Sequence, residues 1–388
     1  MALQGETGSL AEPYIFSVDD HLIEPASLWE SRLPRRLRDR GPIATDTAEG
    51  VLWSLDGQRY PLSGLGASAG RPLEERTTGL RHWDEIRPGC YDPTERVKDM
   101  DIDGVLASLC FPSLPGFGGT KFNALKDRDL GFACIQAYND FQTDEWAASA
   151  RGRLFPMVLL PYWDPYLAIH ELQRTAVKGA VAVAFTENPY RQGFPSIHDK
   201  GRYWDPVFAA AQEAGMPLCL HFGSSSWMMS SAPDAPVIVE SVAGPLNSQL
   251  AFIDWIFSGV LERFPRLQLV FSESYLGWIP FILEHCDRHW TNHFAWATDR
   301  SVVPRVPSEY FQQSISVCLV YDLFGAHHIE TIGVDKVLAE ADYPHPDSLW
   351  PNTKKVLEEC LQHLGPEDRI KVLRTNAEKL FNIELASP

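Results

Sequence analysis

Acidic and imidazole side chains follow short apolar stretches at several well-separated places in the chain. Asp19 and His21 end the first such stretch, and Asp342 ends the last one. Between them, His221 and Glu273 each end another apolar stretch. Carboxylates and imidazoles are side chains that hold divalent metal ions in proteins. If these stretches are parallel strands of one barrel, their carboxyl ends meet at its mouth, and the pattern predicts a metal there.

The spacing within each stretch indicates which side chains share a face. Alternate residues of a strand point to the same side, so Asp19 and His21 point one way and Asp20 the other. Two donors placed in this way at a strand end can chelate one ion. Asp342 shares its face with Glu340, which would lie deeper, and a buried acid needs a partner. We therefore expect Glu340 to support the site rather than to bind the metal.

Three further residues are weaker candidates. Glu187 follows a predicted strand with the right parity, but it precedes Asn188 and Pro189, so a turn-forming role competes with metal binding. His198 and His345 lie in loops expected at the barrel mouth. Either histidine could complete a second metal position, polarise a substrate or simply lie at the surface.

The elements that would position these residues alternate between strands and helices. Eight apolar runs have the length and composition of strands, at residues 14–18, 104–111, 154–160, 179–185, 216–222, 267–272, 314–319 and 337–341. The runs are almost continuously apolar, as expected for strands that are buried on both faces. Segments with helical spacing lie between them. The order predicts an α/β fold, a (β/α)8 TIM barrel with its site at the carboxyl ends of the strands.

We expect residues 1–388 to form a single barrel domain with one insertion after the first strand and an extra C-terminal helix. Residues from about 41 to 93 are rich in Gly, Pro and charge, with a hairpin expected around residues 55–58. This insertion would be a cap or arm that covers the barrel mouth or a partner subunit. The loop at residues 111–119 would line a pocket, and residues 368–383 have the amphipathic pattern of a closing helix.

Composition argues against several classes of protein. The 388 residues include 51 acids and 34 bases, for a formal charge of −17, and no basic stripe, so we expect no nucleic-acid partner. The seven cysteines have no CxxC spacing, which argues against a disulfide scaffold and a zinc–thiolate site. We find neither a signal-peptide pattern nor an apolar run of the roughly 18 residues needed to span a membrane. We therefore expect a cytoplasmic protein without membrane contact. Because barrels with long insertions often associate, we also expect a homodimer or related heteromer.

Five segments resemble the amidohydrolase-related superfamily, in the branch called amidohydrolase family 2. They lie at residues 18–25, 220–223, 272–280, 341–346 and 375–381. The resemblance spans nearly the whole chain and implies a metal-dependent enzyme built on a barrel. That branch includes decarboxylases, hydratases and hydrolases, and a few members are dinuclear non-haem iron monooxygenases.

The chain departs from the family pattern in two places. Asp19 stands where the first-strand motif usually has a histidine, and Glu273 replaces the sixth-strand histidine. The ligand set that the resemblance implies is thus rich in carboxylates, namely Asp19, His21, Glu187, His221, Glu273 and Asp342, with His198 as a further candidate. Carboxylates are hard oxygen donors that favour Fe(II) or Mn(II), and they can bridge two ions.

Three functions fit this set. We favour a dinuclear iron monooxygenase that binds two Fe, uses O2 and hydroxylates a C–H bond of a small, largely apolar substrate. The alternative is a mononuclear Zn or Mn hydrolase or non-oxidative decarboxylase that acts on a small carboxylic acid or amide. Asp342 would then shuttle a proton, with Glu273 and His345 as further catalytic candidates. A non-catalytic partner subunit is the third option, against which the retained ligand set argues.

The sequence predicts which kinds of side chain line the substrate pocket, but it does not identify the substrate. Several aromatic residues, among them Phe117, Trp227 and Tyr275, fall in or near loops at strand ends and favour a partly apolar substrate. Lys121 and Arg191 lie in such loops and could bind a carboxylate, although a solvated surface role competes for each.

Overall fold

The structure of the protein is a computed structural model that describes residues 14–293, 295–297 and 299–385. Its strands follow the predicted order along the chain. The barrel strands are β1 (Ile15–Leu22), β5 (Val105–Pro112), β6 (Leu154–Phe155), β7 (Met157–Val158), β8 (Ala182–Thr186), β9 (Leu218–His221), β10 (Leu269–Ser272), β11 (Ile315–Leu319) and β12 (Val337–Ala339). Nearly all their residues are buried, which explains why these runs are apolar without alternation.

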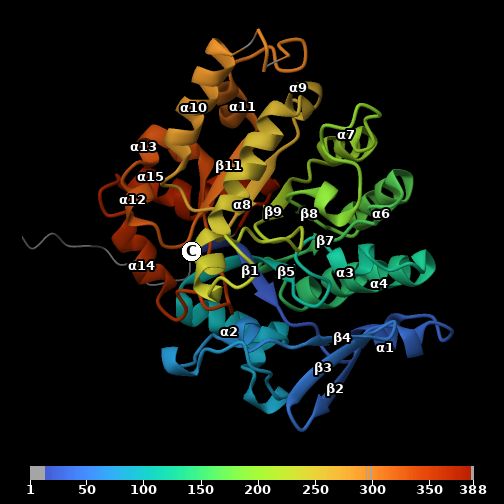
Figure 1. The fold of residues 1–388 in the computed structure, drawn as a ribbon. Helices are drawn as coiled ribbons and strands as arrows, with labels where there is room; N and C mark the ends of the chain where they lie inside the picture. Colours follow the sequence, from blue (N-terminus) through green and yellow to red (C-terminus); the bar gives the residue numbers. More distant parts are fainter. Residues whose placement is uncertain (1–13, 294, 298, 386–388) are drawn as a thin grey trace, which may run out of the picture.

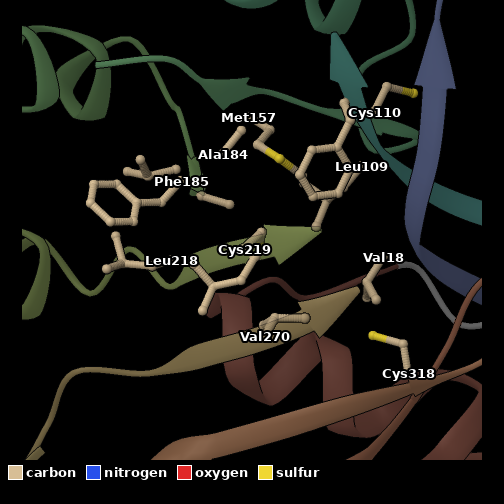
Figure 2. Close-up of a cluster of buried hydrophobic side chains, with 14 of the residues drawn as sticks. Val18, Leu109, Cys110, Met157, Ala184, Phe185, Leu218, Cys219, Val270 and Cys318 are labelled. Carbon is tan, nitrogen blue, oxygen red and sulfur yellow. The ribbon is translucent and has the colours of Figure 1, made fainter. Parts of the chain in front are cut away.

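The strands form one closed parallel barrel, so the predicted TIM barrel is confirmed (Figure 1). The sheet order is β6-β5-β1-β12-β11-β10-β9-β8-β7, and every pair is parallel. β6 and β7 are two halves of one strand, interrupted at Pro156 because proline lacks the N–H that a ladder needs. The core lies inside the barrel and between the barrel and its helices. Figure 2 shows buried side chains from several of the strands, among them Val18, Leu109 and Val270.

Helices connect the strands and cover the outside of the barrel (Figure 1). They are α1 (Leu28–Arg32), α2 (Pro93–Asp103), α3 (Thr120–Asn123), α4 (Arg128–Phe141), α5 (Ala147–Ser149), α6 (Pro165–Val177), α7 (Asp205–Ala214), α8 (Val237–Phe257), α9 (Val260–Arg263), α10 (Ile279–Asn292), α11 (Pro307–Ser314), α12 (Leu323–Ala326), α13 (Ile329–Ile332), α14 (Thr353–Cys360), α15 (Pro366–Ile370) and α16 (Asn376–Phe381). The expected C-terminal helix is present as α15 and α16, joined by a π-helical turn at Lys371–Thr375. It ends where Asn382 turns to a left-handed conformation with φ +52°.

The region between β1 and α2 contains a small antiparallel sheet beside the barrel (Figure 1). Its strands are β2 (Ile43–Thr47), β3 (Gly50–Leu55) and β4 (Gln58–Pro61). The hairpin expected around residues 55–58 is present, and its two turn residues, Asp56 and Gly57, have φ +47° and +80°. Trp53 of β3 packs edge-on against Trp29 of α1, with ring centres 5.5 Å apart. The role of this sheet as a cap or arm stays a prediction.

Two sequence-based expectations on the chain as a whole can be compared with the described residues. None of the helices in these ranges has both the length and the apolar character required to cross a membrane. All seven cysteines are buried and free, so no disulfide links them.

Candidate metal centre

The predicted ligands come together where strands of the barrel end. Asp19 and His21 lie on the last part of β1, and His221 is the final residue of β9. Glu273 follows β10 directly, and Asp342 lies just beyond the end of β12. Because parallel neighbours end at the same rim, residues that are far apart in the chain become neighbours here.

Nitrogen and oxygen atoms of these side chains lie within a few ångströms of one another. His21 Nε2 is 3.4 Å from Asp19 Oδ1 and 3.2 Å from Asp342 Oδ1. His221 Nε2 is 3.1 Å from Glu273 Oε2 and 3.7 Å from Asp19 Oδ2. Asp342 Oδ1 also lies 3.2 Å from Nδ1 of the loop histidine at position 345. We call this set the carboxylate–histidine cluster: Asp19, His21, His221, Glu273, Asp342 and His345.

Most donor atoms of the cluster lack the hydrogen bonds that buried polar atoms normally make. In the described part of the chain, both carboxylate oxygens of Asp19 and Asp342, both ring nitrogens of His21 and Nε2 of His221 have no hydrogen-bond partner. Two sets of three residues each offer three ligand atoms that lie within 4.8 Å of one another. The sets are Asp19, His21 and His221, and His21, Asp342 and His345, so His21 belongs to both. Such a set of unsatisfied oxygen and nitrogen donors fits a divalent cation.

The tautomer of His221 also suits metal binding. Its Nδ1 lies 2.6 Å from the carbonyl oxygen of Phe222. Because a carbonyl oxygen can only accept, Nδ1 must carry a proton, and in the neutral ring Nε2 then has the lone pair that a metal needs. Fixing one ring nitrogen with a backbone carbonyl is a common way of orienting a histidine ligand.

The carboxylates of the cluster repel one another. Burial raises the pKa of Asp19, and the nearby carboxylates of Glu340, Asp342 and Glu273 raise it further. Burial and the charge of Asp342 raise the pKa of Glu273 to about 7. Burial and the neighbouring His345 hold the pKa of His21 well below its usual range. Burial acts to raise the pKa of Asp342, but His345 and His21 outweigh it and lower that pKa. A bound cation would offset the repulsion among these carboxylates.

The backbone is held in an unusual conformation at two of these positions. Glu273 and Asp342 have φ +48° and +50°, a left-handed conformation that is uncommon outside glycine. The N–H of Glu273 donates to Oε2 of Glu340 over 3.0 Å, and the N–H of Asp342 donates to the Asp19 carbonyl over 2.9 Å. Glu340 therefore supports the segment that carries Glu273, as the sequence predicts. Strained backbone of this kind concentrates at functional sites.

Asp20 points away from the cluster, as the alternation in β1 predicts. Its carboxylate accepts hydrogen bonds from the Ser108 hydroxyl and, over 3.0 Å, from the N–H of Tyr343. The register between β1 and β5 shifts between Ser17 and Asp20, which marks a bulge. Bulges change the direction of side chains beside active sites, and this one lies at Asp19, a residue of the cluster.

The carboxylate of Glu187 does not belong to either set of potential ligand atoms that includes His21. Its carboxylate accepts hydrogen bonds from the hydroxyls of Ser224 and Ser225, from the Gly223 N–H and from the Asn247 amide, over 2.5–3.2 Å. These four bonds use the acceptor capacity of the carboxylate, so it holds the loop after β9 in place. The sequence interpretation missed this clamp. The serine run that directly follows β9 is the signal that could have revealed it.

His198 is also placed outside the cluster. Its side chain is 43% exposed, and Nε2 lies 2.6 Å from Oδ1 of Asp254 on α8. This pair links the loop after β8 to a helix at the surface. We therefore leave His198 out of the proposed metal centre.

A cavity of about 230 Å³ adjoins the cluster. Its wall includes His345 and Phe117 from barrel loops, and Trp53 and Tyr60 from the inserted sheet. The Phe117 ring in this wall packs against His221, with their ring centres 4.2 Å apart. Drug-sized sites span roughly 300–1,000 Å³, so this cavity suits a single-ring molecule. A larger cavity of about 570 Å³ lies against α8 and α10 and has no cluster residue in its wall.

Of the two loop cations predicted to bind a carboxylate, only Lys121 lines the cavity of about 230 Å³. Arg191 is exposed and stacks on Trp227, with its guanidinium 4.1 Å from the ring centre. The structure thus brings one ammonium group to the pocket beside the cluster.

The chain belongs to the amidohydrolase family, whose model matches residues 71–383. The γ-resorcylate decarboxylase of Rhizobium sp. (strain MTP-10005) is 23% identical over 331 residues, which cover 78% of this chain and 91% of that protein. A solved amidohydrolase of Mycobacterium avium subsp. paratuberculosis K-10 superposes with a TM-score of 0.72 at 18% identity and covers 96% of this chain and 99% of its own. The solved 5-carboxyvanillate decarboxylase of Novosphingobium aromaticivorans DSM 12444, complexed with manganese, gives a TM-score of 0.68 at 18% identity and covers 99% and 100%.

These comparisons correct the preference for an oxidoreductase. The chain is a metal-dependent enzyme of the amidohydrolase-related superfamily, and the two decarboxylases that it resembles are carboxy-lyases rather than monooxygenases. They give no support for iron. The inference from carboxylate richness was wrong because hard oxygen donors suit Mn(II) as well as Fe(II), so the donor set alone does not select iron chemistry.

Proposed function

We propose that the protein is a metal-dependent, non-oxidative decarboxylase of a small aromatic carboxylic acid. The observation that carries this proposal is the set of buried donor atoms without hydrogen-bond partners, next to a cavity the size of one ring. The names of the γ-resorcylate and 5-carboxyvanillate decarboxylases support the reaction class, because both substrates are phenolic carboxylic acids. Aromatic side chains in the wall, Trp53, Tyr60 and Phe117, favour a flat ring.

Five residues would hold the metal: Asp19, His21, His221, Glu273 and Asp342. We favour manganese, since three of the five are carboxylates and the solved 5-carboxyvanillate decarboxylase holds manganese. When bound, the ion supplies positive charge that attracts the substrate anion and stabilises negative charge as it develops.

The side chains of the protein would orient the ring and supply a proton. Breaking the bond between the ring and its carboxylate releases CO2 and leaves an electron pair on the ring carbon, which must then take up one proton. His345 lines the cavity, and its Nδ1 lies 3.2 Å from Oδ1 of Asp342. Asp342 would accept the Nδ1–H bond and hold the imidazolium, whose Nε2 proton passes to the ring carbon. Phe117 and Trp53 would exclude water from this step.

Release of CO2 by the metal-loaded protein tests the proposal. The protein is stripped with a chelator, reloaded with Mn2+ and incubated with γ-resorcylate or 5-carboxyvanillate, in air and under argon. We expect CO2 release from at least one of them, at the same rate in both atmospheres. His345→Gln should lower kcat about 100-fold or more with unchanged metal content, because general acid catalysis contributes about 10²–10⁴-fold. The exposed His363 provides the matched control, His363→Gln. A fully loaded protein that releases no CO2 from either acid would overturn the proposal.

A further inference from the structure

Lys121 is the one lysine or arginine among the described residues that line the cavity beside the cluster. It lies in α3, directly after the loop that carries Phe117. Its Nζ donates to the Leu114 carbonyl over 2.7 Å and lies 5.1 Å from the ring centre of Tyr60. The ammonium is thus held between a barrel loop and the inserted sheet, at a fixed place in the wall.

This ammonium has unused binding capacity. An ammonium group has three N–H donors, and one of them is taken by the Leu114 carbonyl. No carboxylate oxygen of the described residues lies within 4.0 Å of Nζ, so Lys121 has no ion pair there. Burial lowers the pKa of Lys121, which shows that holding the charge at this place is costly.

The acid in the same wall, Glu24, acts on this charge only at a distance: its own charge raises the pKa of Lys121, which burial lowers more strongly. Glu24 accepts hydrogen bonds from the N–H groups of Ser113 and Leu114, each over 2.9 Å, so both of its oxygens are directed at the backbone. Burial raises the pKa of Glu24 to about 7, although the backbone hydrogen bonds and the charge of Lys121 act to lower it. A half-buried cation with no carboxylate oxygen of the described residues within 4.0 Å of its Nζ therefore faces the cavity.

The size of the cavity limits where a substrate can place its substituents. At about 230 Å³ the space holds one substituted ring. When the carboxylate to be lost lies at the end that His345 lines, the other substituents of the ring face the remaining wall, which includes Lys121. A second anionic substituent there would find the unpaired ammonium within reach.

We infer that Lys121 binds a second anionic group of the substrate, so that the preferred substrates are aromatic dicarboxylates rather than monocarboxylates. This inference rests on the proposed function for the identity of the reacting carboxylate. Lys121 is a positioning and specificity-determining residue, and it takes no part in the proton transfer. Its ammonium would donate its two remaining N–H bonds to the second carboxylate, and the aromatic side chains of the wall would pack against the ring.

The structural alternative is that Lys121 only joins the loop to the inserted sheet. Two variants separate these roles. Lys121→Gln keeps an N–H donor for the Leu114 carbonyl but removes the charge, and Lys121→Arg keeps the charge. Lys126→Gln removes a charge from an exposed position in the same region and serves as the matched control.

The test measures binding and does not depend on turnover. Isothermal titration of the manganese-loaded protein uses two probes, benzene-1,3-dicarboxylate and benzoate. We expect wild type to bind the dicarboxylate at least about tenfold more tightly than benzoate, and Lys121→Gln to weaken dicarboxylate binding about 10- to 100-fold. Benzoate binding should change less than about threefold, and Lys121→Arg and Lys126→Gln should stay close to wild type.

Several results would overturn the inference. They are equal affinity of wild type for the two probes, no dicarboxylate binding by wild type, and equal losses for both probes in Lys121→Gln. Melting temperatures and metal contents of all variants show whether a loss reflects misfolding. If wild type discriminates between the probes through Lys121 but releases CO2 from no carboxylic acid, the proposed function fails while the role of Lys121 stands.

Discussion

Among single residues, His221 and Glu273 give the clearest test of the metal centre. Their side chains approach to 3.1 Å where β9 and β10 end. We expect His221→Ala and Glu273→Gln each to reduce bound metal at least about tenfold, because losing even a residue that supports a ligand costs about 10- to 100-fold in affinity. Elemental analysis after dialysis against low metal gives the occupancy.

His198→Ala serves as the control for this measurement. It removes an exposed imidazole that pairs with Asp254, so metal content should stay at the wild-type level. Wild-type occupancy in both His221→Ala and Glu273→Gln would remove these two residues from the centre. Circular dichroism distinguishes loss of a ligand from loss of the fold.

The sequence predicts some site residues better than others, and the difference is physical. Residues such as Asp19 and His221 end apolar runs, and the end of a parallel strand sets both their place and their neighbours. The surroundings of Glu187 and His198 depend on partners that are distant in the chain. Asn247 is 60 residues from Glu187, and Asp254 is 56 residues from His198. No local pattern reports such pairs.

At the scale of elements, Trp53 tests how the inserted sheet is attached. Its side chain is 2% exposed and packs against Trp29, which also contacts Phe122 of α3. Trp53→Ala should lower the free energy of unfolding by about 3–5 kcal/mol, the usual cost of removing a large buried aromatic side chain. Urea denaturation measures this loss. Ile43 is 40% exposed on the same sheet, and Ile43→Ala should change stability by no more than about 0.5 kcal/mol. Equal losses would mean that the Trp53 contact does not stabilise the molecule.

A buried carboxylate between two helices predicts a dependence of stability on pH. Asp103 of α2 accepts hydrogen bonds from the N–H and the hydroxyl of Thr353 at the start of α14, over 2.7 and 2.6 Å. Burial, which these bonds offset only in part, raises the pKa of Asp103 to about 6 from 3.8. The folded state therefore holds this proton more tightly than the unfolded state. Its contribution to stability is complete below about pH 4 and is lost as the pH rises through about 6.

Asp103→Asn keeps the shape of this side chain without the titration. The loss in wild type amounts to about 3 kcal/mol at most, from a shift of roughly two pKa units at 1.36 kcal/mol each. The stability of Asp103→Asn relative to wild type should therefore rise between pH 4 and pH 7. Urea denaturation at several pH values provides the comparison. A difference that stays constant across this range would show that Asp103 does not titrate as described.

The positions of strands could be predicted where the hydrophobic pattern alone determines them. All eight strand positions appear because each is an apolar run between turn signals. The pattern did not show that β1 continues to Leu22, since Asp19 to His21 are polar although they are buried. It also could not show the break at Pro156, which divides one expected strand into β6 and β7, or the π-helical turn between α15 and α16.

At the scale of the whole molecule, the sequence predicts the fold more closely than it predicts the reaction. The barrel follows from the alternation of strands and helices, and so does the position of the site. The reaction depends on which ion and which substrate the cluster accepts, and oxygen donors alone do not distinguish Mn(II) from Fe(II). The homodimer expected from the insertion stays a prediction as well.

Removal of the metal should be visible in the stability of the whole molecule. Without a cation, unsatisfied donors of Asp19, His21 and Asp342 remain buried together in a chain whose formal charge is −17. An ion that binds only the folded state stabilises it by about 3–4 kcal/mol at 100 to 1,000 times its Kd. With an unfolding entropy of about 2.1 cal/mol/K per residue, a chain of 388 residues should melt about 3–5 °C lower after chelation.

Differential scanning calorimetry before and after chelation, and again after addition of Mn2+, measures this shift. Wild type should regain its melting temperature on reloading. His221→Ala, which lacks the lone pair that Nε2 offers to the centre, should respond to the chelator by less than about 1 °C, because it has little metal to lose. An equal shift in wild type and in this variant would place the stabilising ion elsewhere in the molecule. If chelation leaves the melting temperature of wild type unchanged, repulsion among the carboxylates of the cluster does not destabilise the protein. The case for a resident cation would then fail.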